Sequence, residues 1–235
     1  MPRTAPSLLT AFALAAALAA GTVDAQPRYG SDHAVRFRAG LFSPDGDSTY
    51  WEDKELFFTG EAEDFEDVVA GVDFRYGLGP RSAILISGDV YSGEEDQAYL
   101  DFVDDRNRDI FHTTTLDVAS VTAAYTLNLT GPRSPVVPYV GVGGGFYFWS
   151  LEERGDFIDF GVDPPEIFFD VFDDDGATLG WYWMAGIEIP VGPRWGFFAE
   201  GRWVHAEDEL SDDFDELGDL DLGGRQIVGG ASWRF

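Results

Sequence analysis

The 235-residue chain contains no cysteine, which excludes disulfide bonds and thiolate metal sites. Basic residues are scarce: 15 lysines and arginines stand against 43 aspartates and glutamates, giving a formal charge of -28. Such a chain would be repelled by phosphates, which argues against nucleic-acid binding. After the first 25 residues no stretch reaches 18 apolar residues, so we expect any membrane span there to be made of β-strands.

The first 25 residues have the pattern of a secretory signal. Arg3 precedes an apolar run over residues 8–20, which is too short to cross a membrane as a helix. Val23-Asp24-Ala25 then has the small-x-small pattern of a cleavage site. We predict a signal peptide over residues 1–25 and a single domain over residues 26–235. The alternative is a membrane anchor or an ordinary hydrophobic N-terminus.

The rest of the chain alternates apolar and polar residues, as strands with two different faces do. In residues 33–42, Val35, Phe37 and Leu41 share one face, and arginines occupy the other. Counting such runs predicts eight strands, over residues 33–42, 68–77, 82–92, 113–129, 136–149, 178–190, 195–206 and 224–235.

Short and long connections alternate strictly between these strands. The long ones span residues 43–67, 93–112, 150–177 and 207–223 and hold 36 of the 43 acidic residues. In an up-and-down meander, alternate connections lie at the same end, so all short turns share one end and all acidic loops the other. Each short turn contains the strand-breaking tripeptide Gly-Pro-Arg: Gly79, Pro80, Arg81; Gly131, Pro132, Arg133; and Gly192, Pro193, Arg194.

The last strand resembles the C-terminal strand of bacterial outer-membrane β-barrels. It ends on Phe235, and the same parity continues through Ile227, Gly229, Ala231 and Trp233. Residues 138–149 are similar to a glycine-rich strand of the small OmpA/OmpW-like barrels. The resemblance implies an all-β, eight-stranded, antiparallel, up-and-down transmembrane barrel in a Gram-negative outer membrane. It also implies periplasmic turns, extracellular loops, and a C-terminal signal read by the barrel-insertion machinery.

Elementary physics favours the same architecture. In lipid every backbone polar group must be paired, so a β-protein must close on itself. Eight tilted strands of about ten residues suffice to cross the hydrocarbon layer. A soluble barrel of the lipocalin kind is the alternative, with its apolar parity inside. It would not explain the terminal phenylalanine, nor one parity that is so continuously apolar and aromatic.

Charged residues occupy the parity that would face the lumen. Because an eight-stranded barrel only just accommodates its own side chains, and an unpaired buried charge is costly, we predict a mutually paired salt-bridge network that plugs the barrel. A conducting pore is the alternative. The predicted network comprises Arg36, Arg38, Asp73, Arg75, Asp89, Glu188, Glu200, Arg202 and Arg234.

No catalytic residue set is legible in the chain. Lipid-modifying enzymes on this scaffold need a histidine, a serine and an acid near the outer rim. His112 and His205 fall near that rim, but Thr114 stands where a serine would follow His112, and His33 falls at the opposite end. We therefore predict solvated rim histidines and no enzymatic activity.

The acidic loops offer oxygen ligands for cations, but neither residues 170–176 nor 211–221 fit the spacing of a calcium loop, since Val171 stands where an oxygen is needed and the later glutamate is missing. We expect diffuse cation binding, no defined metal site and no cofactor. The acid excess also suggests adaptation to high salt, or an adhesive or cation-collecting surface.

The function that these observations favour is a non-enzymatic structural or surface-interaction barrel with long acidic extracellular loops. A narrow porin-like channel of the OmpW kind, for small cationic or hydrophobic solutes, is the alternative, and a lipid-modifying enzyme is a distant third. The lipid bilayer is the partner common to all three.

Overall fold

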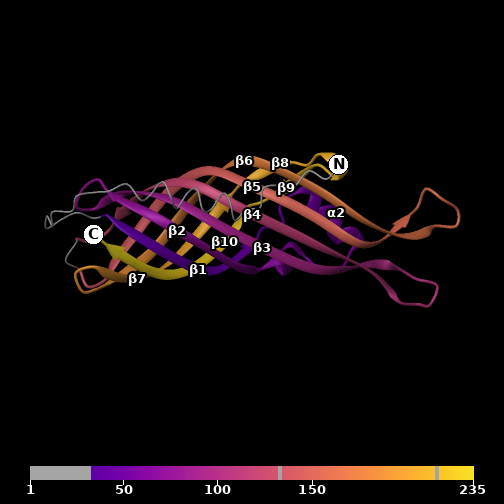
Figure 1. Cartoon of the computed structure of the whole chain (residues 1–235), viewed down its shortest axis with the longest axis horizontal. Coiled ribbons are helices and arrows are strands. Elements are labelled where there is room, and N and C mark those ends of the chain that lie inside the picture. Colours follow the sequence, from indigo (N-terminus) through magenta and orange to yellow (C-terminus); the bar gives the residue numbers. More distant parts are fainter. Residues whose placement is uncertain (1–32, 132–133, 215–216) are drawn as a thin grey trace.

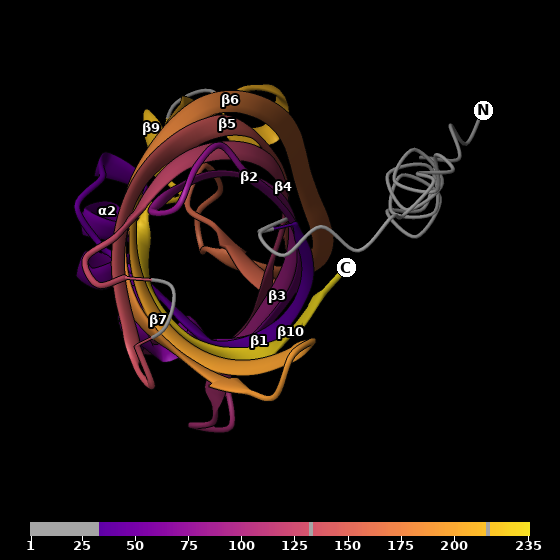
Figure 2. The same ribbon diagram turned by 90° about the vertical axis from the view of Figure 1, so that its left-hand side faces the viewer.

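The computed structural model describes residues 33–131, 134–214 and 217–235. The predicted signal peptide lies outside these residues, as do Pro132 and Arg133. Eight antiparallel strands close into one barrel (Figures 1 and 2), which confirms the predicted fold. They are β1 (Ala34–Pro44), β2 (Asp67–Gly77), β3 (Ser82–Val103), β4 (Asp109–Asn128), β5 (Val137–Asp159), β6 (Glu166–Val191), β7 (Trp195–His205) and β10 (Gly224–Arg234).

Each barrel strand pairs with its neighbours in chain order, and β10 pairs back with β1 to close the ring. The outward parity is apolar over the part nearest the short turns: Phe37, Val142, Phe197 and Ile227 are all exposed there. The inward parity of the same strands is buried. This is the arrangement of a barrel whose outer surface contacts lipid.

Three of the four central strands, β3, β5 and β6, are much longer than predicted, and β4 begins four residues earlier than predicted. Residues 93–112 and 150–177 were expected to be loops, yet β3 and β4 leave only residues 104–108 between them, and β5 and β6 only residues 160–165. The prediction was wrong because it searched for an apolar outward parity. Outside the lipid band that parity faces water, and it carries residues such as Asp96, Glu152 and Asp173. The hydrogen-bonded pairing of these strands continues although the alternation of apolar and polar residues has ended.

The two other long connections carry small elements. Between β1 and β2 lie helix α2 (Thr49–Phe57) and the 3-10 turn η1 (Ala62–Phe65). Between β7 and β10 lie β8 (Glu207–Glu209), η2 (Asp212–Phe214) and β9 (Asp219–Asp221), with β8 and β9 forming a two-stranded sheet. No helix in the described part of the chain is long and apolar enough to cross a membrane.

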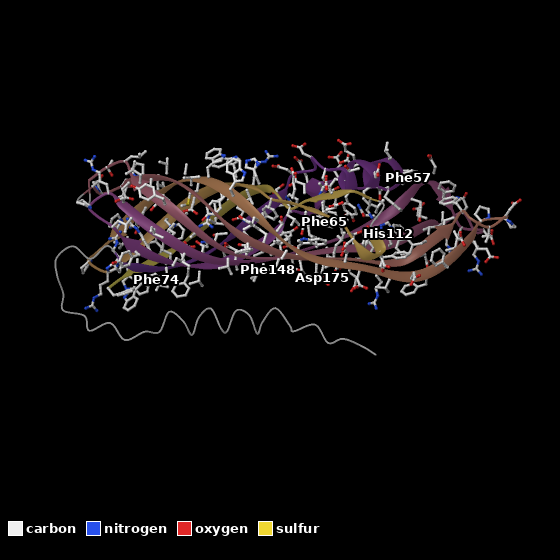
Figure 3. The ribbon with its side chains drawn as sticks, turned by 90° about the horizontal axis from the view of Figure 1, so that it is seen from above. Phe57, Phe65, Phe74, His112, Phe148 and Asp175 are labelled. Carbon is white, nitrogen blue, oxygen red and sulfur yellow. The ribbon has the colours of Figure 1, made fainter. Side chains whose placement is uncertain are left out.

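The strand lengths divide the molecule into two parts, which Figure 1 shows along its long axis. All eight strands form the closed part, here called the membrane half. Beyond it only β3 to β6 continue, and α2, η1, η2 and the small sheet pack on their inward face. This part is called the extracellular half, after the orientation that is proposed below. Along the axis of Figure 3, Phe74 and Phe148 lie in the membrane half, and His112 lies further toward the projecting strands.

Candidate functional site: the barrel interior

The lumen of the membrane half contains a network of paired charges. Strand β1 supplies Arg36 and Arg38 from its inward face. The Arg36 guanidinium lies 3.0 Å from a Glu200 carboxylate oxygen and 3.6 Å from Asp73. Arg38 forms ion pairs with both Asp73 and Asp89. Two successive inward positions of one strand thus reach carboxylates on three others.

Arg202 on β7 completes this network. Its guanidinium nitrogens lie 2.5 Å from Glu200 and 3.6 Å from both Asp73 and Asp89. Three arginines therefore face three carboxylates, with side chains no more than 9% exposed, and the group is neutral overall. Neutrality matters because an uncompensated charge in a lumen this narrow would be costly.

Strand register explains how the side chains meet. Arg36 and Asp73 are direct cross-strand partners, and Gly71 lies between Arg38 on one neighbouring strand and Asp89 on the other. A side chain at Gly71 would overlap the Asp89 carboxylate, and its first carbon would lie 3.1 Å from the Arg38 guanidinium carbon. The glycine leaves the space in which Arg38 and Asp89 pair.

A second charged group lies nearer the short turns. Glu188 accepts hydrogen bonds from Arg234 at 2.6 Å and from the Ser232 hydroxyl at 2.7 Å, and Arg75 lies 3.5 Å away. The structure thus places all nine predicted network residues in two ion-pair groups. Eight of them are buried, and the Arg234 side chain is 21% exposed at the barrel end.

Sequence reasoning missed the neutral members of both groups. The Tyr139 hydroxyl donates to Glu200 at 2.7 Å and accepts from Arg36 at 2.9 Å, and Ser232 contacts Glu188 as described. Both residues have the inward parity of their strands, which was the available signal. They were overlooked because only charged residues were considered.

An apolar layer lies directly beyond the charged network. Inward residues of the barrel strands pack there against side chains from α2, η1, η2 and β9. A cavity of about 20 Å³ remains between the two layers, lined by Asp89, Ser120, Gln226 and apolar neighbours. That volume holds about one water molecule. The layer includes Phe42, Tyr91, Leu116, Tyr147, Trp149 and Leu151 from the barrel strands, and Tyr50, Trp51, Phe65, Phe214, Leu220 and Leu222 from the connections.

Lys54 of α2 is the centre of a polar cluster in the extracellular half. Its ammonium group lies 2.8 Å from Glu153 and 2.8 Å from the Nε2 atom of His112. The Tyr50 hydroxyl donates to the same Glu153 oxygen at 2.6 Å, and Thr114 lies 3.4 Å from the lysine. The cluster fastens α2 to the inward face of β4 and β5.

Burial and the neighbouring Lys54 charge together determine the protonation of Glu153 and His112. Burial disfavours the ionised form of Glu153, but Lys54 and the hydrogen bonds outweigh it and lower the pKa of that carboxyl. Burial and the neighbouring Lys54 charge lower the pKa of His112 to about 4, so its ring is neutral at pH 7. Nε2 then accepts a hydrogen bond from the Lys54 ammonium group, and Nδ1 carries the ring hydrogen.

The other histidines lie in different settings. The prediction that the rim histidines are solvated was wrong for His112, which is buried because α2 covers it. His205 is exposed and stacks on Trp181, with ring centres 4.4 Å apart. His33 lies at the short-turn end beside Tyr76. Among the described residues no group of histidine and acidic side chains could hold a metal ion.

The predicted turn residues lie at one end of the barrel, and the C-terminal strand ends there. Gly79, Pro80 and Arg81 join β2 to β3, and Pro193 and Arg194 lie between β6 and β7 beside Gly192, whose φ of 90° favours glycine. Gly131 belongs to the third turn. On β10, Ile227 is exposed, and Gly229, Ala231 and Trp233 share its outward parity. The ring of Phe235 lies 5.4 Å from that of Trp233.

Several solved structures resemble the chain. Neisserial surface protein A is 11% identical, with a TM-score of 0.48, covering 86% of this chain and 96% of its own. OprG from Pseudomonas aeruginosa is 10% identical, with a TM-score of 0.47, covering 87% of this chain and 97% of its own. Ail, the attachment invasion locus protein of Yersinia pestis, is 13% identical, with a TM-score of 0.43, covering 86% of this chain and 97% of its own.

The comparison with curated proteins gives no match. The family model of the outer membrane protein beta-barrel domain, however, matches residues 9–235, which is nearly the whole chain. The chain therefore belongs to the outer membrane protein β-barrel family, and its place is the outer membrane.

Proposed function

We propose that this protein is a non-enzymatic structural barrel that is closed to solutes and presents an interaction surface outside the cell. The observation that carries the proposal is the filled lumen. A neutral network of six charges is followed along the axis by an apolar layer that α2 and η1 help to build.

A closed lumen follows from the chemistry of the two layers. An ion entering the charged layer would have to separate arginines from carboxylates that are mutually paired and out of water. The next layer offers it Trp51, Leu116 and Leu151, which cannot replace its hydration shell. The cavity between the two layers has room for about one water molecule, which is too little for a hydrated ion.

We further propose that the acidic connections face the exterior and the Gly-Pro-Arg turns the periplasm. In this orientation the C-terminal strand, with Trp233 and Phe235, is the segment that the insertion machinery reads during biogenesis. The acidic surface then collects cations diffusely, because its carboxylates are spread over four connections.

Conductance in planar bilayers tests the closed state. Protein whose folded form has been verified by gel shift is expected to give no reproducible current steps, as in a detergent-only control. Cation-selective steps would overturn the proposal and favour the narrow channel.

The absence of enzymatic activity is tested on the lipid. Lipid A from cells with and without the protein is expected to have the same mass spectrum. A change in acyl chains that depends on the protein would instead establish a lipid-modifying enzyme.

A further inference from the structure

The projecting strands end in two separate arms. Pairing between β4 and β5 begins at His112 and Gly155, so beyond that level the β3–β4 hairpin and the β5–β6 hairpin are no longer paired to each other. The two hairpin ends, residues 99–111 and 156–172, are here called the distal arms. Figure 1 shows them as two distinct projections at the end of the molecule opposite the short turns.

The distal arms expose large apolar side chains far from the lipid band. Phe148 lies on β5 within the lipid band, and Phe160 directly follows the end of that strand. The twelve positions between them span about 40 Å of extended chain. Even with the tilt of barrel strands this is outside the hydrocarbon of the protein's own membrane. Phe111 is 54% exposed and Phe169 is 65% exposed, and Leu100, Phe102 and Ile167 are exposed as well. Apolar surface of this extent usually marks an interaction site.

Contacts between aromatic rings hold the arms in place. Phe102 of one arm meets Phe160 of the other edge-on, with ring centres 5.0 Å apart. Phe157 packs against Phe172 at 4.8 Å, and the Ile158 amide donates to the Tyr99 hydroxyl at 3.3 Å. The apolar surface is therefore already ordered before anything binds, which reduces the entropy cost of binding.

The negative charge of the arms determines which kind of partner could bind to their apolar surface. Residues 99–111 and 156–172 contain nine carboxylates and two arginines, a net charge of -7. One of the two, Arg108, is engaged by Asp104 at 2.5 Å. A second copy of the arms would be repelled, and so would an anionic lipid surface. A basic partner would be attracted and would find apolar side chains between the acids.

We propose that the distal arms bind a cationic amphipathic polypeptide segment, with its apolar side chains on the arms' aromatic residues and its basic side chains on their carboxylates. The inference rests on the proposed surface-interaction role and names the chemistry of the partner.

The test uses the full-length protein in lipid nanodiscs and a fluorescent peptide of alternating lysine and leucine patches, at physiological salt. The variant Phe111→Ser with Phe169→Ser is expected to weaken binding by about tenfold, since a few buried aromatic contacts dominate interfaces of this kind. The matched control, Leu56→Ser with Phe57→Ser, removes equally exposed apolar side chains from α2 and should leave affinity unchanged.

A second pair of variants tests the charges. Asp105→Asn with Glu166→Gln should weaken binding by about threefold and reduce its salt dependence. Glu52→Gln with Glu55→Gln makes the same charge change on the exposed face of α2 and should have less effect. A lysine–serine peptide of equal charge should bind more weakly than the amphipathic one.

Three outcomes would overturn the inference. Equal losses in arm and control variants would mean diffuse attraction to an acidic surface. Concentration-dependent dimerisation abolished by Phe169→Ser would identify a second copy as the occupant. Flotation of the protein with zwitterionic vesicles through the same residue would identify a membrane. Conductance is measured separately, so a conducting barrel with binding arms would refute the proposed closed state alone.

Discussion

The two halves of the barrel fill the same inward face differently: a network of six charges in one, and a large apolar layer with a smaller polar cluster around Lys54 in the other. In the membrane half the inward face holds the paired arginines and carboxylates among apolar side chains such as Leu85 and Met184, and the outward side chains are apolar. In the extracellular half β4 and β5 turn Leu116 and Leu151 inward and acids such as Glu152 outward. Each half matches its outer surface to its surroundings, lipid or water, and the inward face takes the remaining residue types.

The charge network of the membrane half is a consequence of closure in lipid. A buried ion pair is weak evidence of stability, because desolvation offsets much of its attraction. Removing only one partner of such a pair is strongly destabilising, because the other partner is left charged and unpaired. The membrane half is therefore more sensitive to loss of one charge, and the extracellular half to loss of one large apolar side chain.

The largest effect is expected for Arg202→Ala or Glu200→Ala in the membrane half. Each leaves buried partners of the opposite charge unpaired, and each should lower the free energy of unfolding by about 3–5 kcal/mol. The measurement is the temperature at which the folded band disappears in a heat-modifiability gel. If neither variant shifts that temperature, the network does not hold the barrel together.

The matching change in the extracellular half is Trp51→Ala. Trp51 is 1% exposed and packs against Tyr50 and Phe65. Its replacement by alanine should lower the free energy of unfolding by about 3 kcal/mol. This is near the low end for such substitutions, because the connections around Trp51 can move into the space that it leaves. Protease cleavage within residues 43–67 should accelerate while the folded barrel band persists. Phe57→Ala, on the exposed side of the same helix, should change neither; a melted barrel would contradict the division into two halves.

A pH dependence is expected from His112. Its folded-state pKa of about 4 lies below the ordinary 6.5, so the folded state binds the proton more weakly than the unfolded state. Its stabilising contribution is complete above pH 6.5 and is lost as pH falls toward 4, by about 2 kcal/mol.

The comparison of wild type with His112→Gln isolates this effect. The variant should lose less stability between pH 6.5 and 4, whereas His205→Gln should follow the wild type. Asp221, whose pKa burial raises to about 6, changes in the opposite sense but contributes equally to all three proteins. Identical curves for wild type and His112→Gln would refute the assignment.

The smallest effect is expected for Arg225→Ala. Arg225 is 55% exposed and lies 3.5 Å from Asp45 and 3.4 Å from Glu63, so its ion pairs are screened by water. The change should cost about 0.5 kcal/mol or less. A loss as large as that of Arg202→Ala, in the same gel assay, would remove the distinction between buried and surface charge.

The sequence was informative where lipid imposes one rule on every strand. Alternation located Arg36, Asp73 and Glu200 on the inward parity, because an apolar outward face makes the other parity stand out. It also identified the short turns, whose glycine and proline residues have strong local preferences.

The extracellular half could not be predicted in the same way. In residues 166–172 apolar side chains fall on both parities, so the continuation of β6 leaves no periodic signal. The burial of Lys54 and His112 depends on a contact between residues 58 positions apart, which no local pattern encodes. The apolar layer was missed because Trp51 and Phe65 lie in a segment that reads as an acidic loop.

Lys54 is the only lysine in the chain, and its side chain is 5% exposed. The described surface therefore presents no lysine amine to a reagent while α2 is in place. An amine-reactive label would modify Lys54 only as fast as the helix leaves β4 and β5. The chain thus contains its own chemical reporter, placed so that the rate of lysine labelling measures the opening of the extracellular half while the barrel beneath stays closed.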